Sequence, residues 1–408
     1  MNARLVLVLV LAFLAAPASA QEARWWRGNT HTHTLWSDGD AAPEMVVDWY
    51  HRNGYDFLVL SDHNQIQEGE RWFPVTEGPR LTEAHVRSIF NRFGADQVEL
   101  RETAEGGREM RLLTLAELEA RFEAPGEFEL IPGEEITAHW TAPPATPGER
   151  GVRHPVHVNA VNLAEYVPPR GADSVVDLMN ATLAAVAEQA ERLGRPILAH
   201  LNHPNYGWGV SWRDLAAMRH ERFFEVYNGH WQVRNEGDET HPSTERMWDL
   251  ANARRLTELR LPLLYGVAVD DAHNYYGTLT SQPGRGWVVV RATELSGDAI
   301  VEAMQRGDFY ASSGVELEDV VVGDGRYEVH VAARDGIETT TRFVGTRRDG
   351  TGTGPVGEVL LETQENPAIY RFRGDELYVR AVVESSRVHP NPYRAGDHEM
   401  AWTQPFAR

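Results

Sequence analysis

The chain has 408 residues, no cysteine and a formal net charge of −21 at pH 7. The lack of cysteine excludes disulfide bonds, so stability must come from burial and from any ligand that binds the folded state. The negative charge, with no basic run to offset it, argues against a role in nucleic-acid binding.

The first 20 residues have the pattern of a secretory signal. Arg4 precedes an apolar run from Leu5 to Ala16, and the small residues Ala18-Ser19-Ala20 suit cleavage. The run is shorter than the ~20 apolar residues of a membrane-spanning helix, and no later stretch approaches that length. We therefore expect an exported protein, periplasmic or secreted, that is cleaved near Ala20 and does not insert stably into the membrane.

The segment His31–Asp38 contains the first candidate metal ligands. Two histidines one residue apart on an extended strand point to the same side, and Asp38 follows where the chain would turn. Imidazole and carboxylate groups are common ligands of borderline divalent cations. The segment alone is a weak signal, because two exposed histidines at this spacing are common without a metal.

From about residue 25 to residue 310, short apolar runs alternate with amphipathic helical patterns, which is typical of β/α units around a parallel sheet or barrel. The expected strands are Phe57–Leu60, Phe128–Ile131, Val156–Val161, Pro196–Leu201, Phe223–Tyr227 and Leu263–Val269. One helix is expected over residues 175–193, ending before Gly194, and another from Ser243 to Leu256.

Three further segments interrupt or follow this pattern. Residues 65–127 are long for one connection and are interpreted as an insertion, with a helix at 82–93 and a capping box at Thr114 and Glu117. The Pro- and Gly-rich stretch 141–153 is expected to be a loop and is a candidate lid. After residue 313 the period becomes two, so a catalytic domain at 21–313 and a small all-β domain at 314–408 are predicted.

Potential ligands recur where successive expected strands end, which is where α/β barrels assemble their active sites. In chain order they are Asp62 and His63, Glu134 and Glu135, His157, His200 and His203, and then Asp270, Asp271 and His273. This recurrence makes a metal site a much stronger prediction than any single motif does.

The ordered set resembles the polymerase and histidinol phosphatase (PHP) family of metal-dependent hydrolases over roughly residues 28–275. The resemblance implies a distorted barrel of about seven β/α units and a cluster of two or three divalent ions, which would be Zn, Mn or Fe. The ligands that it implies are His31, His33, Asp38, His63, Glu135, His157, His203, Asp271 and His273. Glu134, His200 and Asp270 are the alternative ligands within their motifs.

Within this set Glu135 is the expected bridging ligand, because a carboxylate can neutralise two neighbouring cations. The other ligands are expected in three groups: His31, His33 and Asp271; Asp38, His63 and His273; His157 and His203. The ions would activate water for in-line displacement, so Glu135 and Asp271 count as catalytic. His230 or His200 is the candidate proton donor.

These features predict an exported metal-dependent hydrolase of a small ester, with a phosphomonoester or phosphodiester favoured and no serine or cysteine nucleophile. Where many PHP phosphatases have a basic residue after His203-Pro204, this chain has Asn205; Arg213 and Arg153 are candidate replacements.

Aromatic residues near the ligand motifs suit a flat or apolar leaving group. They are Trp36, Trp208, Trp212, Trp231 and Tyr276. A carboxylic ester or carbamate hydrolase is therefore the first alternative, since the chain also looks like exported PHP-superfamily members that cleave aryl carbamates. A non-catalytic surface protein that binds metal or glycan is the second, and the oligomeric state stays open.

Overall fold

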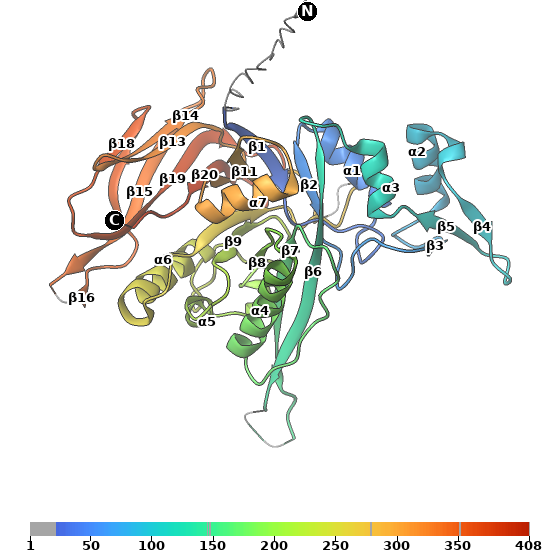
Figure 1. Ribbon diagram of the computed structural model, residues 1–408, viewed down its shortest axis with the longest axis horizontal. Coiled ribbons are helices and arrows are strands. Elements are labelled where there is room, and N and C mark those ends of the chain that lie inside the picture. The colour runs from blue at the N-terminus through green and yellow to red at the C-terminus, as the bar shows by residue number, and fades with distance from the viewer. Residues whose placement is uncertain (1–21, 145, 147, 278–279, 351, 408) are drawn as a thin grey trace, which may run out of the picture.

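The computed structural model describes residues 22–144, 146, 148–277, 280–350 and 352–407. The expected signal sequence at residues 1–20 lies outside these residues. No helix in the described ranges is long and apolar enough to cross a membrane. The chain forms a mixed α/β fold on one large central sheet (Figure 1).

The first half of the central sheet carries the expected strands. In sheet order it consists of β10 (Tyr265–Val269), β9 (Phe223–Asn228), β8 (Leu198–Leu201), β7 (Val152–Val161), β6 (Glu129–Ala142), β2 (Phe57–Leu60) and β1 (Arg24–Asn29). The sheet continues through β11 (Trp287–Ala292), β12 (Phe309–Ser312), β20 (His398–Thr403), β19 (Glu376–Val388), β15 (Thr339–Asp349) and β16 (Gly352–Thr353), and β17 (Glu358–Thr363) also pairs with β15.

The expected (β/α)7 barrel is not what forms, because the sheet is mixed and open. β7 is antiparallel to both β6 and β8, and β1 pairs on its far side with antiparallel β11. At the other edge, the chain after β10 meets the chain after β1 at a bridge between Ala272 and Thr32 and at a backbone hydrogen bond from Asp40 to His273, without a continuous ladder between β10 and β1. A parallel β6–β7 pair would need a crossover of about a dozen or more residues, and the connection here is too short.

The stretch 141–153, which was expected to be a loop, is partly strand. Ala142 pairs with Val152, so β6 and β7 extend into it from both sides and form a long hairpin. This hairpin projects from the body of the molecule at the bottom of Figure 1. A role as a lid stays a prediction.

Seven α-helices accompany the strands in the described part of the chain. They are α1 (Pro43–Arg52), α2 (Glu83–Phe93), α3 (Leu115–Phe122), α4 (Val175–Leu193), α5 (Trp212–Ala216), α6 (Thr244–Arg254) and α7 (Gly297–Arg306). The predicted end of α4 is confirmed, because Gly194 follows it with a φ of 63°. The predicted capping box of Thr114 and Glu117 begins α3. Helix α6 runs on into a π-helical turn, Arg255–Leu259.

Residues after β2 form a separate small sheet beside the main body, at the right of Figure 1. Its strands are β3 (Arg71–Val75), β5 (Arg108–Leu112) and β4 (Leu100–Glu102), in that order. Val86 of α2 and Met110 of β5 share a hydrophobic core with Leu35 and Trp36. The small sheet therefore supports the back of the segment that carries the first candidate ligands.

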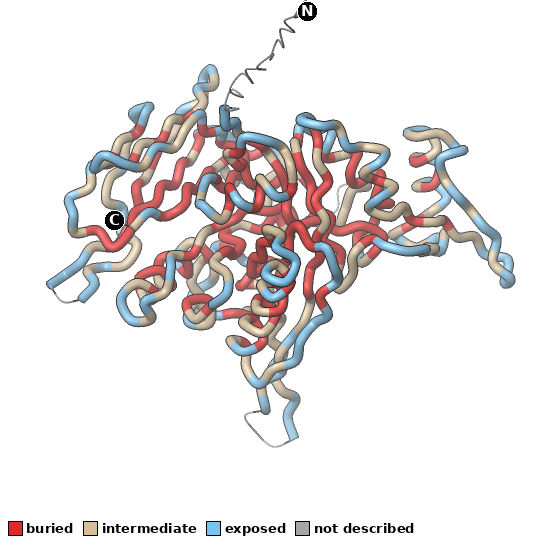
Figure 2. Tube along the Cα trace, in the orientation of Figure 1, coloured by how far each residue is buried: buried red, intermediate tan, exposed pale blue. Residues whose placement is uncertain are grey.

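The C-terminal strands are joined closely to the rest. β13 (Leu317–Gly323), β14 (Arg326–Val331) and β18 (Ala368–Arg371) form their own sheet, whereas β15, β19 and β20 extend the central one. One hydrophobic core contains Trp248 of α6 together with Val382 of β19, and buried chain runs continuously through this region (Figure 2). The domain boundary at residues 313 and 314 stays a prediction.

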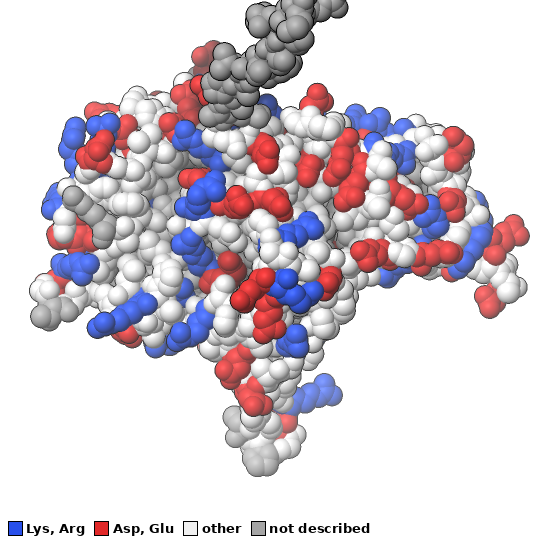
Figure 3. Space-filling model, viewed as in Figure 1, with Lys and Arg blue, Asp and Glu red and all other residues white. Residues whose placement is uncertain are grey.

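Acidic and basic side chains are interspersed on the face shown in Figure 3, and the described residues of that face form no continuous basic surface.

Candidate metal centre

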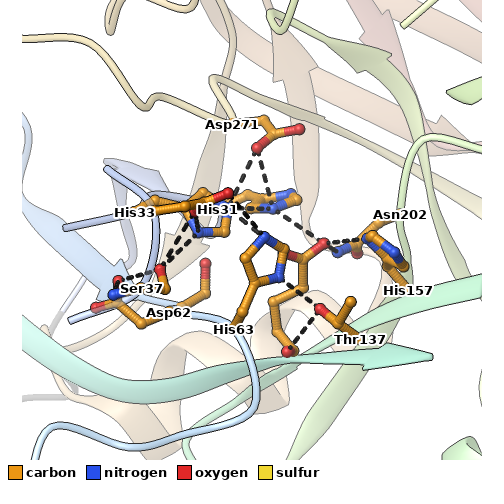
Figure 4. A network of polar contacts seen from close by, with 12 residues as sticks. His31, His33, Ser37, Asp62, His63, Thr137, His157, Asn202 and Asp271 are labelled. Atoms are coloured by element: carbon orange, nitrogen blue, oxygen red, sulfur yellow. Dashed lines mark hydrogen bonds and ion pairs between the residues drawn. The ribbon is translucent and has the colours of Figure 1, made fainter. Parts of the chain in front are cut away.

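The side chains predicted as ligands converge at one place, where β1, β2, β8 and β10 end and where β6 and β7 run past. His31 and His33 follow β1, Glu135 lies in β6, and Asp271 follows β10. The bridge between His63 and Glu135 brings the chain after β2 onto β6. His31, His33, His63 and Asp271 point toward one another in Figure 4.

The carboxylate of Glu135 lies at the centre of this cluster and is completely buried. Its oxygens lie within 3.5 Å of ring nitrogens of five histidines: His63 at 2.6 Å, His157 at 2.9 Å, His33 at 3.4 Å, His203 at 3.4 Å and His31 at 3.5 Å. This is the position that a bridging ligand would need, because both oxygens face nitrogen donors.

Four overlapping groups have donor atoms close enough to hold an ion, all within 4.8 Å of one another. They are His33, Asp38, His63 and His273; His31, His33 and Asp271; His31, Glu135 and His203; and His63, Glu135 and His157. The first two groups contain two of the expected sets. His157 and His203, which were expected to share an ion, fall in separate groups, each with Glu135.

The cluster is open to solvent at one end only. The side chain of Asp38 is 52% exposed, that of His63 26% and that of His273 16%. In contrast, the side chains of His31 and Glu135 have no exposed surface. We refer to Asp38, His63 and His273 as the open end, and to His31, His33, Glu135, His203 and Asp271 as the closed end.

The donor set fits divalent cations. The Nε2 atoms of His31 and His33 lie 3.1 Å apart, and Oδ1 of Asp271 lies 3.3 Å from each. Oε2 of Glu135 is buried and accepts no well-directed hydrogen bond from any described residue. Zinc, manganese and iron bind to imidazole nitrogens and carboxylate oxygens in proteins. These are the donor atoms that crowd together here.

Electrostatics keep the carboxylates of the cluster ionised. Burial alone would raise the pKa of Glu135, but the charges of the neighbouring His63 and His31 outweigh it and hold this pKa well below its usual range. The pKa of Asp271 is held low in the same way, against the effect of burial, chiefly by His31 and His33. Both carboxylates are therefore available to a cation, which requires deprotonated ligands.

Glu225 of β9 supports the closed end and was not predicted. It is 1% exposed, and its Oε1 lies 2.6 Å from Nδ1 of His31. Its Oε2 accepts hydrogen bonds from the backbone N–H of His203 at 2.7 Å and from Nδ2 of Asn228 at 2.8 Å. The sequence contained one signal for this role. Glu225 is the single carboxylate in the otherwise apolar run 223–227, and a charge buried there without a partner would destabilise the fold.

Asp62 was noted in the sequence only as part of a motif, and it shapes the turn before Asp38. Its Oδ1 accepts hydrogen bonds from the backbone N–H of Thr34 at 2.8 Å and from the hydroxyl of Ser37 at 2.5 Å. Gln67 donates to its other oxygen. Figure 4 shows Asp62 beside Ser37. Because Asp38 follows Ser37 directly, Asp62 holds the turn that presents Asp38 to the open end.

The three alternative ligands lie outside the four groups. Glu134 accepts a hydrogen bond from the backbone N–H of Val167, and burial raises its pKa to about 8. Asp270 accepts from the Tyr50 hydroxyl and from backbone N–H groups of residues 284–286. His200 is wholly buried, with Nδ1 3.6 Å from Glu225. The geometry thus places Glu135, His203 and Asp271 among the donors. The alternatives Glu134, His200 and Asp270 lie next to the donor groups but belong to none of them.

His230, the candidate proton donor, lies at the edge of the open end. Its ring centroid is 5.1 Å from that of His273 and 6.4 Å from that of Tyr206. Burial, reinforced by the charge of His273 and against the attraction of Asp271, lowers the pKa of His230 to about 4. The imidazole is therefore neutral near pH 7.

The five aromatic residues do not form one wall. Trp36 is 3% exposed and belongs to the core, while Trp212 packs against another core cluster. Trp208 stacks on His241 and Tyr276 on His85, both with centroids 4.0 Å apart. Of these five residues, only Trp231 is exposed, at 53%.

Two arginines of the inserted segment lie near the turn that carries Asp38, Arg80 directly and Arg71 beside Trp36. Nε and Nη2 of Arg80 donate to the carbonyl oxygens of Gly39 and Ser37, on either side of Asp38. Arg71 contacts Gln65 and lies 5.3 Å from the Trp36 ring. In the described residues neither arginine forms an ion pair with a carboxylate.

The arginines suggested by the sequence lie elsewhere. Arg213 lies over the ring of Trp212 at 4.3 Å, and Nη2 of Arg153 lies 3.3 Å from His139. Both are exposed.

Taken together, these residues form a candidate polynuclear centre of histidine and carboxylate donors. No family model and no curated protein matches the chain. Similar solved structures include a two-domain protein containing a predicted PHP-like metal-dependent phosphoesterase from Bacteroides vulgatus, with 16% identity, 94% of this chain and 96% of that chain covered, and a TM-score of 0.38.

Two other solved structures are also similar in part. One, from Bifidobacterium adolescentis, is described as a putative metal-dependent phosphoesterase: it shares 13% identity, the match covers 69% of this chain and 96% of that chain, and the TM-score is 0.32. The other is an amidohydrolase from Chromobacterium violaceum, with bound sulfate and no metal: 14% identity, 61% of this chain and 88% of that chain, TM-score 0.27.

Proposed function

We propose that this chain is a PHP-type metal-dependent hydrolase that cleaves small phosphoesters with metal-activated water. The observation that carries the proposal is the convergence of nine histidine and carboxylate side chains, open to solvent at one end. When bound, divalent ions would lower the pKa of a water molecule and stabilise the charge that develops on the scissile group.

The protein's own residues divide the remaining work. His31, His33, Glu135 and Asp271 hold the closed end and keep bulk water out of it, because they have little or no exposed surface. The substrate approaches at Asp38 and His273. His230, which is neutral near pH 7, would donate a hydrogen bond to the leaving group beside His273.

An anionic substrate is favoured by Arg80 and Arg71. Their charges have no carboxylate partner among the described residues, and Arg80 brackets the backbone of the exposed ligand Asp38. Guanidinium groups bind phosphate oxygens in charge-assisted pairs. These arginines would serve where the basic residue after His203-Pro204 is missing.

A carboxylic ester or carbamate hydrolase on the same site is the second candidate. It is favoured by the aromatic side chains at the edge of the cluster. Tyr206 lies with its ring centroid 5.1 Å from that of His203, and the exposed Trp231 adjoins His230. Such rings would stack on an aryl leaving group.

Metal analysis combined with a substrate panel tests the proposal. We expect at least two ions per chain after loading, and the highest kcat/KM on aryl phosphates or phosphodiesters rather than on aryl esters and carbamates. Faster cleavage of the esters or carbamates supports the second candidate instead. Less than one ion per chain, with no turnover, supports a non-catalytic binding protein.

Export is part of the proposal, and it rests on the sequence of residues 1–20. Expression of the full chain in a Gram-negative host should yield a mature protein in the periplasm or medium whose N-terminus follows Ala20. A full-length protein confined to the cytoplasm contradicts export.

A further inference from the structure

We propose that Glu225 is a positioning residue that makes the closed end of the cluster the tighter of two kinds of cation position. This inference rests on the metal centre of the proposed function. In this proposal Glu225 does not bind the cation itself. It orients three side chains that would bind the cation, namely His31, His203 and Asp271.

The first contact of Glu225 fixes the orientation of the His31 ring. Its Oε1 lies 2.6 Å from Nδ1 of His31, and both side chains are completely buried. A carboxylate at this distance accepts a hydrogen bond from the Nδ1–H group and so fixes the ring with Nε2 facing His33 and Asp271. Such a carboxylate also makes the imidazole a stronger ligand.

The second oxygen of Glu225 holds two ligands that have unusual backbone conformations. It accepts a hydrogen bond from the backbone N–H of His203, whose φ is 20°, and one from Asn228. Asn228 also donates, at 3.0 Å, to Asp271, whose φ is 49°. Residues other than glycine occupy positive φ at a cost, so these bonds help to keep both side chains turned into the cluster.

The open end has no such support from Glu225. His63 is held by Thr137 at 2.5 Å, and Nδ1 of His273 lies 2.9 Å from the backbone oxygen of Asp271. Asp38 is half exposed to solvent, which weakens its attraction for a cation. The closed end is therefore more deeply buried than the open end, contains two carboxylates instead of one, and has ligands that Glu225 holds in place.

Titration of the metal-free full chain with Mn²⁺ by calorimetry tests the proposal. We expect wild-type protein to bind in two phases of different affinity. Glu225→Gln keeps the shape of the side chain but places an amide NH₂ where one carboxylate oxygen accepted a hydrogen bond. The variant should therefore weaken the tight phase by about 10- to 100-fold and leave the weak phase unchanged. The matched variant Asp38→Asn should do the reverse.

Two further measurements separate positioning from loss of fold. Asn228→Ala breaks the link to Asp271 but keeps the contact between Glu225 and His31, so it should weaken the tight phase less than Glu225→Gln does. Far-UV circular dichroism of the metal-free variants should match that of the metal-free wild type, which excludes loss of fold as the cause.

The outcomes distinguish this inference from the proposed function. Biphasic binding that Glu225→Gln leaves unchanged, or weakens equally in both phases, overturns the role of Glu225 alone. Biphasic binding that Glu225→Gln alters as expected, without hydrolysis of any substrate, upholds that role and overturns the proposed activity. A wild-type chain that binds no cation overturns both.

Discussion

The Nε2 atoms of His31 and His33 face each other at 3.1 Å, and neither side chain has exposed surface. Two imidazole lone pairs at this distance repel unless a proton or a cation lies beside them, and the same Asp271 oxygen lies 3.3 Å from each. This arrangement makes the pair the part of the cluster that depends most on a bound cation.

His33 belongs to two of the four donor groups, whereas His273 belongs to one. Replacing His33 by alanine should therefore reduce the bound metal at both ends and lower kcat/KM more than 100-fold, which is about 3 kcal/mol. Replacing His273 should reduce metal only at the open end. Metal content and steady-state rates measure both effects, and full activity of His33→Ala with unaltered metal content would falsify the site.

Removing the metal should destabilise the protein, because a ligand that binds only the folded state adds to the free energy of unfolding. At a free metal concentration of about 100 times Kd this amounts to about 2.7 kcal/mol per site. We expect chelation to lower Tm by several degrees and added Mn²⁺ or Zn²⁺ to restore it. A Tm that does not respond to chelator or metal contradicts a bound cation.

Arg80→Gln should raise KM for an aryl phosphate by about tenfold, since a charge-assisted contact contributes roughly 1.5 kcal/mol. A neutral aryl ester, if it is cleaved, should be unaffected. Arg87 on α2 is exposed, so Arg87→Gln is the matched control. Equal effects of the two substitutions would remove the argument for an anionic substrate.

Glu44 at the start of α1 is 3% exposed, its Oε2 has no partner among the described residues, and burial raises its pKa from 4.5 to about 7. Between these values the folded protein keeps a proton that the unfolded chain releases, so the free energy of unfolding falls as pH rises through this window. At pH 8 the penalty is complete, on the order of 3 kcal/mol.

Glu44→Gln removes this penalty, so the variant should be more stable than wild type at pH 8 and similar to it at pH 4. Urea denaturation at both pH values measures the difference. Glu77→Gln, at an exposed position, is the control and should show no such pH dependence. A stability difference that does not change with pH rules out the titration of Glu44 as its cause.

Arg380 of β19 and Asp249 of α6 form an ion pair at 2.8 Å, with both side chains buried. Asp249→Asn leaves the arginine charge buried and only partly compensated, so it should lower the free energy of unfolding by about 3–5 kcal/mol. Because this pair joins strand β19 of the C-terminal region to helix α6, we expect the whole described chain to unfold in one transition that shifts as a unit. Two separate transitions, with only one affected, would indicate independent units.

The sequence revealed the ligands because they follow expected strands, and the end of a strand is marked by a change from apolar to polar residues. His63 after Phe57–Leu60 and Asp271 after Leu263–Val269 are examples. It did not reveal Glu225, because alternation inside a strand does not say which neighbour a buried carboxylate meets. The antiparallel direction of β7 was also missed, since strand residues carry no mark of direction and only the shortness of the turn gave a hint.

The grouping of ligands into ions was the least predictable part. His157 lies in β7, and His203 follows β8. The spacing of the motifs along the chain does not show that these two histidines fall in different donor groups, each containing Glu135. Arg80 was missed for the same reason, because it reaches Asp38 from an inserted segment whose path no periodicity encodes.

β1, the strand that leads into His31 and His33, lies between β2 and β11 and pairs Arg24 with Ala292. One of the first strands to be synthesised must therefore wait for a partner from the last third of the chain, and closing so long a loop delays the contact. Asp271 and His273 also come late. All nine candidate donors are present only once residue 273 has been synthesised, so we expect any cation to be bound in full only late in folding.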